Sequence, residues 1–122
     1  MDKFLKTLKK HLDEQFPGHR VEFLIWTMFS LKVNVHLEKN YFISLRYNAR
    51  NGRMDIALIT NKQRIFGYDN LKTWHYHPYE NPSSHVPCDP PSLEKMLSDT
   101  KKYFEIDKKN NNRQPLPQAQ ES

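Results

Sequence analysis

Hydrophobic and polar residues alternate through the middle of the chain. Five runs rich in β-branched and aromatic residues follow one another: RVEFLIWTM, LKVNVHLE, YFISLRY, RMDIALIT and RIFGYD. In the second run, Leu31, Val33 and Val35 are separated by polar residues, which is the spacing of a half-buried strand. The connections between the runs are too short to reach a parallel neighbour, and one contains Asn-Gly, a common hairpin turn. The pattern therefore predicts an antiparallel five-stranded meander sheet.

Two segments with helical spacing flank the predicted strands. The first has an apolar stripe at Phe4, Leu5, Leu8, Leu12 and Phe16, and it ends at Pro17-Gly18. The second has its stripe at Leu93, Met96, Leu97, Thr100 and Phe104. We expect Asp89 to cap this second helix, with Pro90 or Pro91 in its first turn. Packing both helices on the apolar face of the sheet would bury all the stripes, so we predict a two-layer α+β domain.

The composition indicates one domain followed by a polar end. At 122 residues the chain suits a single domain. Nearly all apolar side chains lie in residues 1–106, so we expect the domain there and a disordered tail over residues 107–122. The single cysteine excludes an internal disulfide, and no apolar run is long enough to cross a membrane. We therefore expect a cytoplasmic protein without membrane contact. The net charge of +5 favours an acidic partner such as nucleic acid.

Residues 68–88, YDNLKTWHYHPYENPSSHVPC, contain three of the six histidines and the only cysteine. His75, His77, His85 and Cys88 would supply four ligands, enough for a tetrahedral zinc site. Two histidines separated by one residue of an extended backbone point to the same side, which suits chelation. Structural zinc sites, however, usually contain pairs of cysteines in short Cys-X-X-Cys segments. We therefore predict no metal or other cofactor and keep a zinc clip as the alternative.

The same histidines are candidates for acid–base catalysis, because imidazole exchanges protons near neutral pH. In RNA the 2′-hydroxyl is the nucleophile, so a protein needs only a base, an acid and positive charge near the phosphate. We predict His75, His77 and His85 as catalytic residues, with Asp69 orienting a histidine or fixing the turn. Candidate residues for binding phosphate or stacking on bases are Arg46, Arg50, Arg64, Trp74 and Tyr76. In the competing interpretation Trp74 is a core residue and the histidines only cap turns.

Three short segments resemble the TumE-type toxins of prokaryotic toxin–antitoxin pairs: Tyr68-Asp69-Asn70, His75-Tyr76-His77-Pro78 and His85. In that family a strand ends in an aromatic-Asp-Asn turn, and a histidine cluster with His-Pro and a further histidine follows. The resemblance covers residues 20–100 and implies activity on RNA and a small helix-turn-helix antitoxin as partner. This chain departs from the pattern in two ways. His85 has no adjacent histidine, and the gap from Asn70 to His75 is longer.

The pattern and the resemblance together predict a toxin-like, metal-independent endoribonuclease. The alternative is a non-catalytic binding module that docks a protein or nucleic acid, with or without zinc held by the histidines and Cys88. A catalytic site requires the three histidines to converge within about 4 Å in a place open to solvent. Histidines that point apart would favour the purely structural interpretation.

Overall fold

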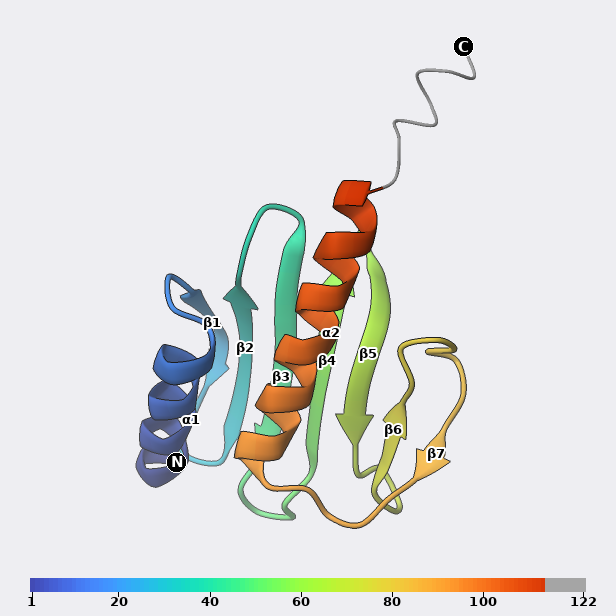
Figure 1. The fold of residues 1–122 in the computed structure, drawn as a ribbon. Helices are drawn as coiled ribbons and strands as arrows, with labels where there is room; N and C mark the ends of the chain where they lie inside the picture. Colours follow the sequence, from blue (N-terminus) through green and yellow to red (C-terminus); the bar gives the residue numbers. More distant parts are fainter. Residues whose placement is uncertain (114–122) are drawn as a thin grey trace.

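The strands form one antiparallel sheet in which neighbours in sequence are also neighbours in space (Figure 1). The computed structural model describes residues 1–113. Its elements, in chain order, are α1 (Asp2–Gln15), β1 (Arg20–Trp26), β2 (Ser30–His36), β3 (Tyr41–Asn48), β4 (Met54–Thr60), β5 (Gln63–Asp69), β6 (His75–His77), β7 (Val86–Pro87) and α2 (Leu93–Arg113). The predicted α+β class and antiparallel meander are confirmed.

The predicted number of five strands is too low, because the sheet has seven within the described residues. The two additional strands, β6 and β7, come from the histidine-rich stretch and contain three and two residues. Strands this short show no repeating apolar pattern, so their sequence does not reveal them. They form because the chain turns back after β5, where Lys72 has a φ of 72° and the Asp69 side chain accepts a hydrogen bond from the Leu71 N–H.

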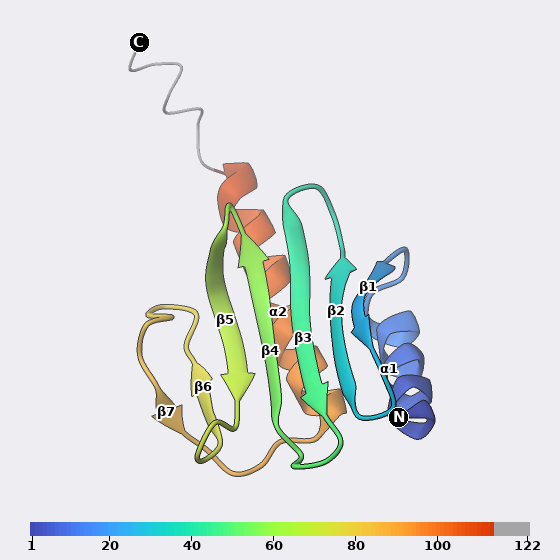
Figure 2. The same ribbon diagram turned by 180° about the vertical axis from the view of Figure 1, so that it is seen from behind.

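Both helices cover the same face of the sheet, and within residues 1–113 the other face carries no helix (Figures 1 and 2). The core lies between these two layers and contains the predicted apolar positions of the strands and helices, among them Leu12, Leu31, Val33, Val35, Ile43, Leu45, Leu58, Met96 and Leu97. Burial of these side chains is the main force that holds the layers together. Among residues 1–113, no helix is long and apolar enough to cross a membrane.

The start of α2 differs from the prediction. The helix begins at Leu93, and the hydroxyl of Ser92 accepts a hydrogen bond from the Lys95 N–H at 3.0 Å, as an N-cap does. Asp89 and the two prolines after it therefore lie before the helix. Ser92 lies directly before the apolar stripe, so its hydroxyl caps the helix in place of Asp89.

The end of α2 also corrects the predicted boundary at residue 106. The helix continues to Arg113, while residues 114–122 of the predicted tail lie outside the described residues. Asp107 is part of the domain, because its carboxylate accepts hydrogen bonds from the hydroxyls of Tyr41 at 2.5 Å and Tyr79 at 2.6 Å. Burial and the bond to Asp107 raise the pKa of both phenols. Polar side chains in this segment thus pair with partners from distant parts of the chain.

Replacing Asp107 with alanine is expected to lower the free energy of unfolding by about 1–3 kcal/mol, because two partly buried hydroxyls lose their acceptor. Urea denaturation followed by circular dichroism measures the change. Lys109→Ala is the matched control: this residue is exposed on the same helix, and its loss should change stability by less than about 0.5 kcal/mol. Equal stability of the two variants would show that the domain does not depend on the segment after residue 106.

Candidate functional site

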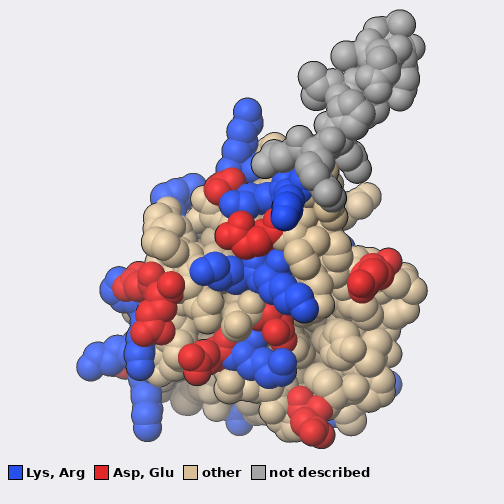
Figure 3. All heavy atoms as spheres, viewed as in Figure 1, with Lys and Arg blue, Asp and Glu red and all other residues tan. Residues whose placement is uncertain are grey.

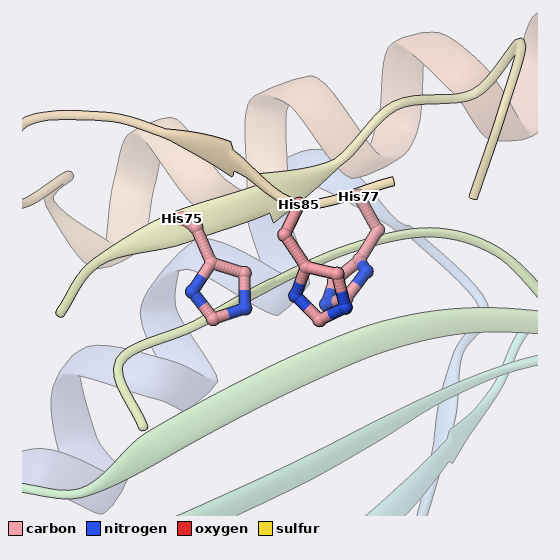
Figure 4. Close-up of side chains that lie close together, drawn as sticks. All are labelled: His75, His77 and His85. Atoms are coloured by element: carbon pink, nitrogen blue, oxygen red, sulfur yellow. The ribbon is translucent and has the colours of Figure 1, made fainter. Parts of the chain in front are cut away.

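Three histidine rings converge beside the short strands β6 and β7 (Figure 4). His75 and His77 project from the same side of β6, and His85 lies directly before β7, which pairs with β6. The ring centroids are 5.2 Å apart for His75 and His77, 4.7 Å for His75 and His85, and 4.6 Å for His77 and His85. One ring nitrogen from each lies within 4.8 Å of the others. The histidines therefore converge, at a slightly longer distance than the sequence hypothesis required.

The cluster lies on the face of the sheet that carries no helix. Asp69 pairs with His75 and Gly67 with His77, and paired residues project to the same side. Their neighbours Phe66 and Tyr68 are buried in the core, so Gly67 and Asp69 face away from it. The open face thus offers a carboxylate next to three imidazoles.

Asp69 connects the cluster. One carboxylate oxygen, Oδ2, lies 3.0 Å from His77 Nε2 and 3.1 Å from His75 Nε2, and the other accepts the Leu71 N–H. Burial raises the pKa of the Asp69 carboxyl, but the bonds with His77 and Leu71 and the nearby histidine charges outweigh this effect. The pKa of Asp69 is consequently lower than its usual value. Asp69 thus contacts two histidine rings and also the backbone of the turn after β5.

Backbone carbonyls hold the second nitrogen of two rings. His75 Nδ1 lies 3.1 Å from the Thr73 carbonyl oxygen, and His77 Nδ1 lies 3.1 Å from the Pro82 carbonyl oxygen. The His77 side chain is 2% exposed and that of His75 13%, whereas His85 is an exposed residue. Two rings are therefore fixed and shielded, and the third is open to solvent.

The three residues of the Tyr-Asp-Asn segment each make a different contact. Tyr68 donates a hydrogen bond to Asp99 on α2 at 2.6 Å, which anchors β5 to the helix layer. Asn70 accepts the Met54 N–H and donates to the Gly52 carbonyl, so it ties the turn after β5 to the start of β4. Asp69, between them, points to the histidines. The segment therefore holds the end of β5 in the position that the cluster needs.

Arg46 lies on the same face as the cluster. A row of paired residues crosses the sheet from Lys32 through Arg46, Asp55 and Asp69 to His75. Arg46 is exposed and is separated from Asp69 by a single strand. Sequence reasoning did not select Lys32 and Asp55, although both occupy polar positions of alternating strands. Strand register brings them into this row, and their polar positions alone do not show which residues become neighbours.

The other two predicted arginines are placed differently. The aliphatic part of Arg64 lies over Gly67 on the open face, with its Cδ 3.4 Å from where a β-carbon would sit. The Arg50 guanidinium instead lies 4.4 Å from the centre of the Phe29 ring, at the turn between β1 and β2. Arg64 thus lies beside Gly67, which pairs with His77, whereas the structure does not bring Arg50 to the histidines.

The predicted stacking residues Trp74 and Tyr76 are not exposed beside the histidines. Both are partly buried and pack against the core. Side chains alternate along a strand, so Tyr76 projects to the opposite face from His75 and His77. There it lines a cavity of about 450 Å³ together with Tyr68 and Cys88. The structural interpretation of Trp74 as a packed residue agrees with the structure.

Cys88 does not belong to the cluster, and this corrects the four-ligand zinc clip. Its side chain lines the cavity on the helix side of the sheet, and the metal-ligand group in the described residues contains only the three histidines. Burial and the neighbouring Asp89 carboxylate raise the pKa of the thiol, so it has little thiolate character. The fourth polar group next to the histidines is the Asp69 carboxylate.

Charged side chains of both signs lie on the helix side of the described residues (Figure 3). Lysines and arginines there lie among acidic side chains over α2 (Figure 3), as in the Lys95–Asp99 and Lys108–Glu105 ion pairs.

Comparison of the chain with models of known protein families, with curated proteins and with solved structures gave no match.

Proposed function

We propose that this chain is the toxin-like member of a toxin–antitoxin pair and cleaves RNA at the cluster of Asp69, His75, His77 and His85. The observation that carries the proposal is the convergence of three histidines and a carboxylate on the open face of the sheet. Tyr68-Asp69-Asn70 and His75-Tyr76-His77-Pro78, the segments that resemble the toxin family, are the same ones that build this cluster.

RNA cleavage suits a site of this size because the substrate brings its own nucleophile. The 2′-hydroxyl attacks the adjacent phosphate, and the protein has to exchange protons and stabilise charge on the phosphate. His85 is the exposed ring and therefore the one that a substrate reaches first. Arg46 lies on the same face and would hold the backbone phosphates of an RNA strand that runs across the sheet.

The partner in this proposal is a small helix-turn-helix antitoxin. Within residues 1–113, six of the seven exposed large apolar side chains lie in one segment: Phe23, Leu24, Ile25, Trp26, Met28 and Phe29. An apolar groove of about 820 Å³ runs between this segment and α1, and Lys3, Lys6 and Lys9 lie along it. An exposed apolar patch of this kind is typical of a protein-binding surface, and the lysines favour a partner with acidic flanks. A non-catalytic binding module would use the same surface, so RNA cleavage distinguishes the two functions.

Purified wild-type protein is expected to cleave RNA, and its expression is expected to slow bacterial growth. His85→Ala should lower the rate of RNA cleavage by about 100-fold or more, the usual contribution of a residue that exchanges protons or stabilises charge. It should also relieve the slow growth. Because His85 is exposed, its replacement should leave the circular dichroism spectrum and melting temperature unchanged. His36→Ala is the matched control, since His36 is a surface histidine of β2 that pairs with Glu22. Intact RNA with the folded wild-type protein, or equal cleavage by the His85 variant, would contradict the proposal.

A further inference from the structure

We infer that Asp69, His75, His77 and His85 form a binding site for a divalent transition-metal ion, with zinc as the ion that fits best. The inference concerns the same residues as the proposed function but follows from their hydrogen bonding alone. It therefore holds whether or not RNA is the substrate. It also replaces the expectation of a metal-independent site.

The positions of the protons on two rings follow from their backbone partners. A carbonyl oxygen only accepts hydrogen bonds, so the Nδ1 atoms of His75 and His77 must each carry the hydrogen that points to Thr73 and Pro82. In a neutral ring this leaves the lone pair on Nε2. Histidines that bind metals have this arrangement in most proteins: one nitrogen donates to a carbonyl or carboxylate and the other binds the ion.

The Nε2 lone pair of His77 points at an atom that is also an acceptor, and His75 Nε2 lies beside the same atom. Asp69 Oδ2 lies 3.1 Å from His75 Nε2 and 3.0 Å from His77 Nε2. His75 Nε2 is shielded from water and has no hydrogen bond of acceptable geometry. Three electron-rich atoms packed this closely repel one another unless positive charge lies among them.

Protonation of the two histidine rings at Nε2 relieves this repulsion only in part. One proton on His77 Nε2 makes a hydrogen bond to Asp69 and leaves His75 Nε2 unsatisfied against the same oxygen. Protonating both rings places two positive charges 5.2 Å apart beside a single carboxylate. One divalent ion, in contrast, accepts electron pairs from both Nε2 atoms, from the Asp69 oxygen and from His85.

The distances agree with a tetrahedral zinc site. Zinc–nitrogen and zinc–oxygen bonds of about 2.0–2.2 Å place neighbouring ligand atoms roughly 3.3 Å apart. The two contacts of Asp69 Oδ2, at 3.0 and 3.1 Å, are close to this value. The three histidine nitrogens, within 4.8 Å of one another, have to approach by about 1–1.5 Å. His85 is exposed, so rotation of its side chain can bring its own ring nitrogen closer to the other two without changing the sheet.

The ligand set selects the class of metal. Three imidazoles and one carboxylate suit zinc, cobalt or nickel, whereas magnesium and calcium prefer sites made of oxygen ligands. The site has the solvent-exposed His85 on one side, so an ion would have access from water. A metal held there would supply the positive charge that phosphodiester cleavage needs.

Metal binding is measured on the full, untagged chain after treatment with EDTA and dialysis. Titration with Zn²⁺ should show one equivalent bound, with a rise in melting temperature because the ion binds the folded state. Co²⁺ at the same site should give the visible absorption of tetrahedral cobalt. Asp69→Asn and His85→Ala should each weaken binding by at least about tenfold. Asp69→Asn retains the oxygen that accepts the Leu71 N–H, so the turn should stay intact.

Two control variants should bind zinc as the wild type does. Cys88→Ser removes the only thiol, and His36→Ala removes a surface histidine of another strand. Absence of saturable zinc binding by the folded wild type would overturn the inference. Weakening by His36→Ala as strong as that by His85→Ala would also overturn it, since the ion would then bind surface histidines in general.

The RNA assay separates this inference from the proposed function. Stoichiometric zinc binding by a protein that leaves RNA intact, with and without zinc, supports the metal site and contradicts the ribonuclease. RNA cleavage by protein that binds no zinc supports the ribonuclease and contradicts the metal site. Cleavage that disappears with EDTA and returns with zinc supports both.

Discussion

Gly67→Val is expected to lower the free energy of unfolding by about 3 kcal/mol, although valine is among the best strand-forming residues. A β-carbon at this position would lie 2.7 Å from the Ile56 carbonyl oxygen and 3.3 Å from the Ala57 Cα. Both atoms belong to the backbone of β4 in the centre of the sheet, so they cannot move aside as a flexible side chain would. Chemical denaturation of the purified variant measures the loss.

The same substitution should impair the site, because Gly67 pairs directly with His77. Displacing β5 from β4 also displaces Asp69, two residues further along the strand. We therefore expect weaker zinc binding in Gly67→Val even at temperatures where the variant is folded. Ser44→Val is the matched control: it introduces the same side chain on the open face in the same row of the sheet. If both variants are equally stable, the close contact at Gly67 does not constrain the strands.

Leu97→Ala is expected to destabilise the protein by about 2–5 kcal/mol, the range for removing a buried leucine side chain. Leu97 is 0% exposed, and it lies next to the buried Met96 near the start of α2. The substitution leaves a cavity between α2 and the sheet that the surrounding backbone cannot fill. Small domains have a total stability of about 5–15 kcal/mol, so this loss is a large fraction of the whole.

Thermal and urea denaturation test this prediction, with Ser98→Ala as the control on the same helix. Ser98 is exposed, and alanine is the better helix former, so the control should be as stable as the wild type or slightly more stable. A loss below about 1 kcal/mol for Leu97→Ala would show that α2 contributes little to holding the two layers together.

The sequence predicted the sheet and the helices because their signals are local and repeated. The alternation around Leu31, Val33 and Val35 corresponds to three fully buried side chains. The short connections adopt the tight turns that their residues favour, with positive φ at Asn40, Asn61 and Gly52. Prediction was less accurate where such repetition is missing. β6 and β7 are too short to show a period. The last turns of α2 are polar, and Asp107 there pairs with Tyr41 and Tyr79, which are distant in the sequence.

For the candidate site, the sequence identified the chemical groups and the tertiary structure decided which of them meet. His75 and His77 share one side of β6 because alternate residues of a strand always do, and this could be read from the sequence. Their contact with Asp69 depends on the register between β5 and β6, which places Asp69 opposite His75. Cys88, close in sequence, lies on the opposite face, where it lines a cavity together with Tyr76. Side-chain identity is a local property, whereas register is set by the packing of the whole sheet, so only the fold could replace the cysteine by Asp69 as the histidines' fourth partner.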